Sequence, residues 1–130
     1  MVTKQKVLQI SRLLAIWLFW PALAVVVWGE LKPGGDMPHV WDKLLHFTAY
    51  FGLSGLAFVA LGAHRRALWG AFGLILLGGV LELLQGMVGR DMSFYDEVAN
   101  TLGAVTGAGV AWAYLALFGP RRLVGSRAPD

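Results

Sequence analysis

The sequence predicts an all-α fold: a bundle of four transmembrane helices in a single domain over residues 1–130. Hydrophobic residues make up 57% of the chain and charged residues 15%, and a small soluble domain could not bury so much apolar surface. The apolar residues also fall into four stretches of about 20 residues, the length that an α-helix needs to cross the hydrocarbon core of a bilayer. Six tryptophans fit this prediction, because Trp favours the interface between lipid and water.

The first predicted span covers residues 10–29 and follows a basic segment, as the apolar region of a secretory signal peptide does. We expect a span that stays in the protein, because bulky residues follow the small ones at Ala22–Ala24. The other predicted spans cover residues 44–63, 67–88 and 98–118. The connections between the spans are too short to hold a second domain.

Basic residues predict the orientation of the bundle. Eight Lys and Arg residues fall on one side of the four-span arrangement and three on the other. The positive-inside rule places the side with eight in the cytoplasm, and both termini with it. The eight residues are Lys4, Lys6, Arg12, Arg65, Arg66, Arg121, Arg122 and Arg127.

Polar and ionisable side chains occur in the three later spans and at their extracytoplasmic ends. Successive helix residues turn by about 100° and rise by about 1.5 Å, so these side chains share one stripe of each helix and a similar depth. We therefore predict one shared polar site in the outer leaflet. Its predicted ligand-binding residues are Asp42, Lys43, His46, Tyr50, Glu82, Gln85, Arg90, Asp96 and Asn100.

Several of these residues also have a purely structural explanation. Gln85 and Asn100 could simply bond helix to helix, and Tyr50 could be an ordinary packed aromatic residue. The segment SFYD is typical of a capping box, in which Asp96 would satisfy backbone N–H groups of the fourth helix.

Glu82 has no such local explanation. A carboxylate inside a span needs a partner or a proton, and we expect His46 and Arg90 to be its partners. On the fourth helix, Gly103 and Gly107 form a small-xxx-small pattern, which lets helix backbones approach closely.

Three segments carry a family resemblance: DKLLHFTAY, ELLQ and GRDMSFYDEVANTLGAVTG, in that order. Together they resemble the VanZ-like family of small bacterial membrane proteins, over about residues 36–109. The resemblance implies a multi-pass protein of the bacterial cytoplasmic (inner) membrane, and it supports treating the polar positions as one site. The family takes its name from a protein linked to teicoplanin resistance, a role that does not transfer to every relative.

The function that we expect first is binding of an anionic amphiphile, such as a phospholipid or a lipid-linked cell-envelope precursor. Lys43, Arg90 and protonated His46 are donors suited to a phosphate or carboxylate. One alternative is an intramembrane enzyme that hydrolyses or transfers a lipid head group, with His46, Glu82 and Asp96 as candidate catalytic residues. The sequence leaves open whether the protein is an enzyme. Another alternative is an accessory protein of glycopeptide resistance.

Other functions and partners find less support in the sequence. A metal site with Asp42, His46, Glu82 and Asp96 as oxygen and nitrogen ligands is a further alternative. One candidate His and no Cys make a poor zinc set, however, so no metal and no cofactor is predicted. No basic patch with interleaved aromatic residues points to nucleic acid. Transport would need polar groups in the cytoplasmic half of the bundle, which the spans lack unless a homodimer supplies them. A homodimer through the small-residue face of the fourth helix remains open.

Overall fold

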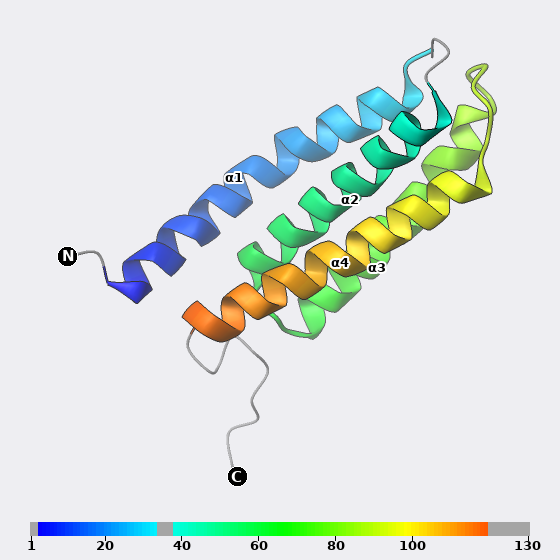
Figure 1. Cartoon of the computed structure of the whole chain (residues 1–130). Helices are drawn as coiled ribbons and strands as arrows, with labels where there is room; N and C mark the ends of the chain where they lie inside the picture. Colours follow the sequence, from blue (N-terminus) through cyan, green and yellow to red (C-terminus); the bar gives the residue numbers. More distant parts are fainter. Residues whose placement is uncertain (1–2, 34–37, 120–130) are drawn as a thin grey trace.

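The computed structural model describes residues 3–33 and 38–119. These residues form four α-helices, and no strand occurs among them. The helices run alternately up and down, so that α1 and α3 end where α2 and α4 begin (Figure 1). We call this the polar end of the bundle. The bounds are Lys4–Leu31 for α1, His39–Leu61 for α2, Arg65–Gln85 for α3 and Phe94–Phe118 for α4.

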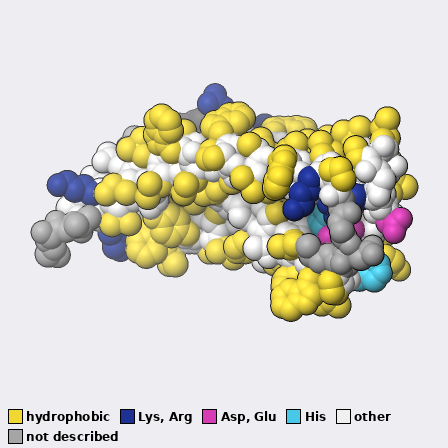
Figure 2. Space-filling model, turned by 90° about the horizontal axis from the view of Figure 1, so that it is seen from above, with side chains coloured by type: hydrophobic (Ala, Val, Ile, Leu, Met, Phe, Trp, Pro, Cys, Tyr) yellow, Lys and Arg dark blue, Asp and Glu magenta, His cyan; other side chains and the backbone are white. Residues whose placement is uncertain are grey.

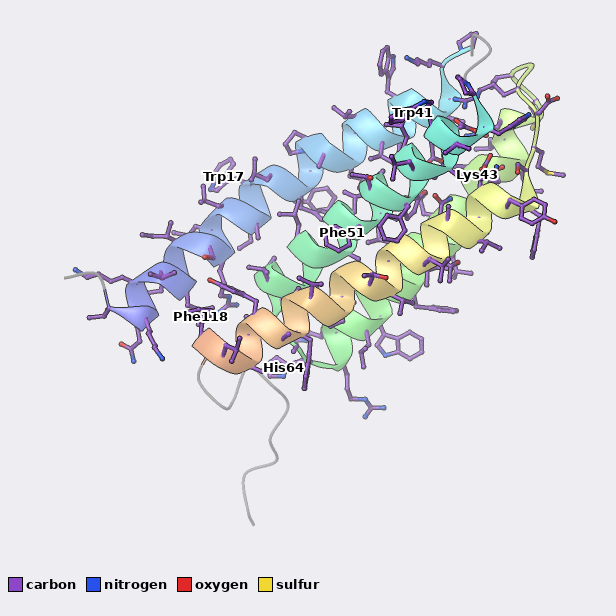
Figure 3. The ribbon with its side chains drawn as sticks, in the orientation of Figure 1. Trp17, Trp41, Lys43, Phe51, His64 and Phe118 are labelled. Atoms are coloured by element: carbon purple, nitrogen blue, oxygen red, sulfur yellow. The ribbon has the colours of Figure 1, made fainter. Side chains whose placement is uncertain are left out.

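The outer surface of the bundle is apolar over most of its length. All four helices are long and apolar enough to cross a membrane. Figure 2 shows hydrophobic side chains over most of the visible face, and Figure 3 shows Trp17 pointing away from the bundle. Trp17 is 77% exposed and Leu117 72%, which is unfavourable in water and suits lipid contact. The chain is therefore an all-α, multi-pass membrane protein, as the sequence predicts.

The helix bounds differ from the predicted spans mainly where polar residues extend a helix. α1 begins before its predicted start, and the Thr3 side chain accepts the Lys6 N–H at 3.4 Å. The predicted end of the third span at residue 88 is wrong. The carbonyl of Gln85 accepts the N–H groups of both Val88 and Arg90, and Gly89 has a φ of 80°, so the chain turns there.

Some sequence-based expectations fall outside the described residues. The basic residues of the C-terminal tail that entered the orientation argument lie beyond residue 119, and the resemblance to VanZ-like proteins begins in the segment 34–37. The expectations that concern Arg121, Arg122, Arg127 and Asp36 therefore lie outside the described residues and stay predictions.

α2 and α4 form the most extensive helix pair of the bundle. Their backbones touch at Gly103 and Gly107, where a Cβ atom would overlap the backbone carbonyl oxygens of Phe47 and Phe51. This contact confirms the close approach that the small-xxx-small pattern predicts. α1 packs more loosely, and three of its residues are buried: Leu8, Ala15 and Glu30.

Candidate functional site

Most of the buried polar side chains lie towards the polar end of the bundle, and all four helices contribute to them. Figure 2 shows acidic side chains and histidine gathered near one end of the visible face, whereas Lys and Arg occur at both ends. Burying so many polar groups is costly unless they bind one another or a ligand. The buried polar residues are Glu30, His46, Ser54, Glu82, Gln85, Asp96 and Asn100.

An ion pair joins α2 to the first turn of α4. Lys43 Nζ lies 2.7 Å from Asp96 Oδ1, and the two side chains are 35% and 4% exposed. Figure 3 shows Lys43 directed towards the start of α4. The predicted capping box is wrong, because the Ser93 side chain makes no cap hydrogen bond and Asp96 binds Lys43 instead. Asp96 therefore fixes a cation at the polar end.

His46 is the centre of the cluster. Its Nδ1 lies 3.0 Å from Asn100 Oδ1 and 3.7 Å from Glu30 Oε1, while its Nε2 lies 4.0 Å from Asp42 Oδ1. Asn100 in turn donates from Nδ2 to Glu97 Oε2 at 3.2 Å. The ring donates to the amide oxygen of Asn100 when Nδ1 carries a proton, and Nε2 is directed towards Asp42.

Arg90 connects the segment after α3 to two other helices. Its Nη1 donates to the carbonyls of Gly29 and Glu30 at 3.1 and 3.2 Å, near the C-terminus of α1. Its Nη2 donates to Asp42 Oδ1 at 3.4 Å. A cation at a helix C-terminus is favourable because the unpaired carbonyls there carry partial negative charge. Arg90 therefore holds α1 against the start of α2.

The predicted partners of Glu82 are wrong. Glu82 makes no ion pair with His46 or Arg90 in the structure; its Oε2 accepts the backbone N–H of Ser93 at 3.0 Å. Glu82 is nevertheless only 4% exposed, and both His46 and Asp96 lie within its electrostatic reach. Through this hydrogen bond, Glu82 joins the end of α3 to the start of α4.

Two residues of the cluster are absent from the predicted site. Glu30 follows the predicted first span at residues 10–29, but it lies within α1 because that helix continues to Leu31. Glu97 contacts Asn100 and faces α3 at Gly78. Extending the first predicted span by one turn would have placed Glu30 inside a helix. Glu97 directly follows the SFYD segment, and the capping interpretation of that segment gave no reason to include Glu97 in the site.

Several buried polar atoms of the described residues have no hydrogen-bond partner. Both oxygens of Glu30 and one oxygen of Glu82 belong to this set, as does the hydroxyl of Tyr50; this hydroxyl lies so close to Glu30 that a small rotation would join the two side chains. Unpaired buried polar atoms are rare in proteins and often mark a position for water, an ion or a ligand. The remaining atoms are Ser54 Oγ and Gln85 Nε2.

The cluster holds more negative than positive groups. Lys43 pairs with Asp96 and Arg90 with Asp42, so each of these two cations is matched by a carboxylate. Three further carboxyl groups lie close by without a Lys or Arg partner among the described residues. They are Glu30, Glu82 and Glu97.

Gly78 makes room for this cluster on α3. A Cβ atom there would lie 2.7 Å from Glu97 Oε2 and 2.9 Å from Asn100 Nδ2, whereas one at Gly79 meets ordinary contact distances. We expect Gly78→Ala to be less stable than Gly79→Ala by about 1–2 kcal/mol, because both changes gain helix propensity but the first crowds polar groups. Denaturation of the purified protein in mixed micelles measures the difference. Equal stability of the two variants would contradict this packing.

Comparison with known proteins assigns no family. No family model and no solved structure matches the chain. Part of it is similar to a "Putative L-rhamnonate dehydratase" of Caldivirga maquilingensis, 32% identical over 98 residues, and to an "L-rhamnonate dehydratase" of Saccharopolyspora erythraea, 32% identical over 77 residues. These alignments cover 72% and 55% of this chain but 24% and 20% of the relatives. Because the chain spans a quarter or less of these relatives, the similarity carries no activity over to it.

Proposed function

We propose that this protein binds the head group of an anionic amphiphile at the polar end of its bundle, with a phospholipid or a lipid-linked cell-envelope precursor as the ligand class. One observation carries the proposal: two partly exposed cations, Lys43 and Arg90, lie at the same end of the bundle as buried carboxyl groups from α1, α3 and α4. The apolar outer surface of the helices offers a place for the lipid tail.

Two kinds of group on the lipid head would bind two kinds of side chain in the site. A phosphate would bind Lys43 Nζ and the guanidinium of Arg90, which are the donors suited to phosphate. Amino or hydroxyl groups of the same head group would donate to the unpaired oxygens of Glu30 and Glu82. The acidic excess therefore favours a head group that carries donors as well as a phosphate.

The location of the site is part of the proposal. We place the polar end at the extracytoplasmic side of a bacterial cytoplasmic membrane, on the basis of the basic residues and of the resemblance to VanZ-like proteins. In the structure, Arg65 and Arg66 lie at the start of α3, at the opposite end from the site. This distribution of basic residues supports the proposed orientation.

We expect Glu82→Gln and His46→Ala to reduce lipid binding at least tenfold without preventing membrane insertion. Glu82→Gln removes one negative charge at almost constant volume, and Asp91→Asn is the matched control because Asp91 is exposed at the same end. Native mass spectrometry of protein extracted with its own lipids identifies the ligand, and titration with that lipid gives the affinity. The proposal fails if both variants retain wild-type binding.

Charge reversal at Arg90 belongs to the same experiment. The affinity of Arg90→Glu should fall more for anionic lipids than for zwitterionic lipids, relative to the wild type. The substitution replaces a donor to phosphate by a carboxylate, which repels net negative charge. Release of a cleaved head group during the incubation would show that the site also performs chemistry on the lipid.

A further inference from the structure

Three potential metal ligands converge at the polar end. One donor atom each from Asp42, His46 and Asp96 can be chosen so that all three lie within 4.8 Å of one another. Ligand atoms that share one ion at about 2.1 Å are separated by up to about 4.2 Å, so small side-chain rotations would bring this set to bonding distance. The ligands come from α2 and α4, the most closely packed pair of helices.

The ring of His46 is oriented as in a metal-binding histidine. Its Nδ1 lies 3.0 Å from Asn100 Oδ1, and its Nε2 faces Asp42. Metal-binding histidines usually donate the other ring N–H to an oxygen acceptor, which fixes the tautomer and the direction of the free nitrogen. Asn100 supplies that acceptor.

A second, independent observation points to a cation. Glu30 is 6% exposed, and neither of its oxygens has a hydrogen-bond partner among the described residues, although Oε1 lies 3.7 Å from His46. Its carboxyl group is therefore directed at the cluster and has not been neutralised by Lys43 or Arg90. A buried carboxyl group of this kind is stabilised by a bound cation or by a proton, and the neighbouring ligand atoms favour the cation here.

We propose that Asp42, His46 and Asp96 bind a divalent transition-metal ion, with Glu30 as a further carboxylate close by. Lys43 and Arg90 already contact Oδ1 of Asp96 and Asp42, so an ion bound here would compete with these two cations for the aspartates or use their other oxygen atoms. One imidazole and several carboxylates suit Zn²⁺ or Mn²⁺ better than Mg²⁺. The sequence alone disfavours a metal here because it offers one candidate His and no Cys, whereas most ligands of the proposed site are oxygens.

The bound ion would also increase the positive charge that the site presents to an anion. It would compete with Lys43 and Arg90 for the aspartates, so the two cations and the metal would together face an incoming phosphate. This second step rests on the proposed lipid-binding function, whereas metal binding itself does not.

Isothermal titration of the purified full chain with ZnCl₂ and MnCl₂ in lipid-free detergent tests the metal site. We expect one ion per chain, tighter binding of Zn²⁺ than of Mn²⁺, and at least a tenfold loss of Zn²⁺ affinity in His46→Ala. His39→Ala is the matched control, because His39 is exposed on the same helix and the same end. It should bind like the wild type.

A second measurement protects the test against misfolding of the variant. Zn²⁺ should raise the Tm of the wild type and of Glu30→Gln, with a smaller shift in the latter, and should not raise the Tm of His46→Ala. Absence of binding to the wild type, or equal binding to His46→Ala, overturns the metal site. Lipid binding that persists unchanged in a chelator overturns the bridging step and leaves the lipid-binding proposal standing.

Discussion

Gly107→Ala should lower the free energy of unfolding by about 2–3 kcal/mol, one of the largest effects that we expect from the loss or gain of a single methyl group in this chain. An added Cβ would overlap the carbonyl oxygen of Phe51 on α2. The atom that it meets belongs to a helix backbone, which cannot rotate away as a side chain can. The two helices must therefore separate along the contact that holds α2 to α4.

Gly109→Ala is the control for this prediction. Gly109 lies two residues further along the same helix, and nothing lies within 4 Å of the position that its Cβ would take. The substitution gains helix propensity and should be neutral or slightly stabilising. Unfolding in dodecyl sulfate mixed micelles, followed by circular dichroism, compares the two variants. The close α2–α4 contact would be refuted if Gly107→Ala were as stable as Gly109→Ala.

Lys43→Met should lower the free energy of unfolding by about 3 kcal/mol, and Asp96→Asn, which breaks the same ion pair, should lower it by less. Removal of the lysine leaves the carboxylate of Asp96, which is 4% exposed, buried without its cation. Removal of the aspartate charge leaves Lys43, which is 35% exposed and can extend into water, so the cost is about 1 kcal/mol. The asymmetry follows from the different burial of the two partners.

The double variant Lys43→Met, Asp96→Asn tests whether the cost comes from the unpaired charge. It should be more stable than Lys43→Met alone, because the amide that replaces the carboxylate of Asp96 carries no charge to bury. The same unfolding assay gives the coupling between the two positions. Additive effects, or a larger cost for Asp96→Asn than for Lys43→Met, would exclude the buried ion pair.

The fold could be predicted from the sequence because the lipid environment restricts the possibilities. Four apolar stretches of sufficient length must become helices, since every backbone group inside a bilayer needs an internal partner. The helix ends were harder to predict. The hydropathy pattern stops before the polar Glu30, whereas α1 continues through it to Leu31; in the third span the pattern continues past Gln85 to residue 88, whereas α3 ends at Gln85.

Most members of the polar cluster, though not Glu30 and Glu97, could also be predicted, but the pairing within the cluster could not. Helical periodicity placed His46, Glu82 and Asp96 on inward faces, and the structure buries all three. Which donor meets which acceptor depends on rotation of the helices by tens of degrees and on rotamers, which periodicity does not determine. For this reason Glu82 was assigned to His46 and Arg90, although it binds the backbone at Ser93.

Because α1 packs loosely, we expect that less free energy is needed to separate it from the bundle than to separate the other helices. Its contribution to the cluster is Glu30, and near the polar end it is held by hydrogen bonds from the guanidinium of Arg90 to two carbonyl groups. Undocking of α1 would therefore cost less than separating α2 from α4, and it would expose His46 sideways to the bilayer. A ligand that displaced Arg90 from these two carbonyl groups would therefore weaken the docking of the whole helix.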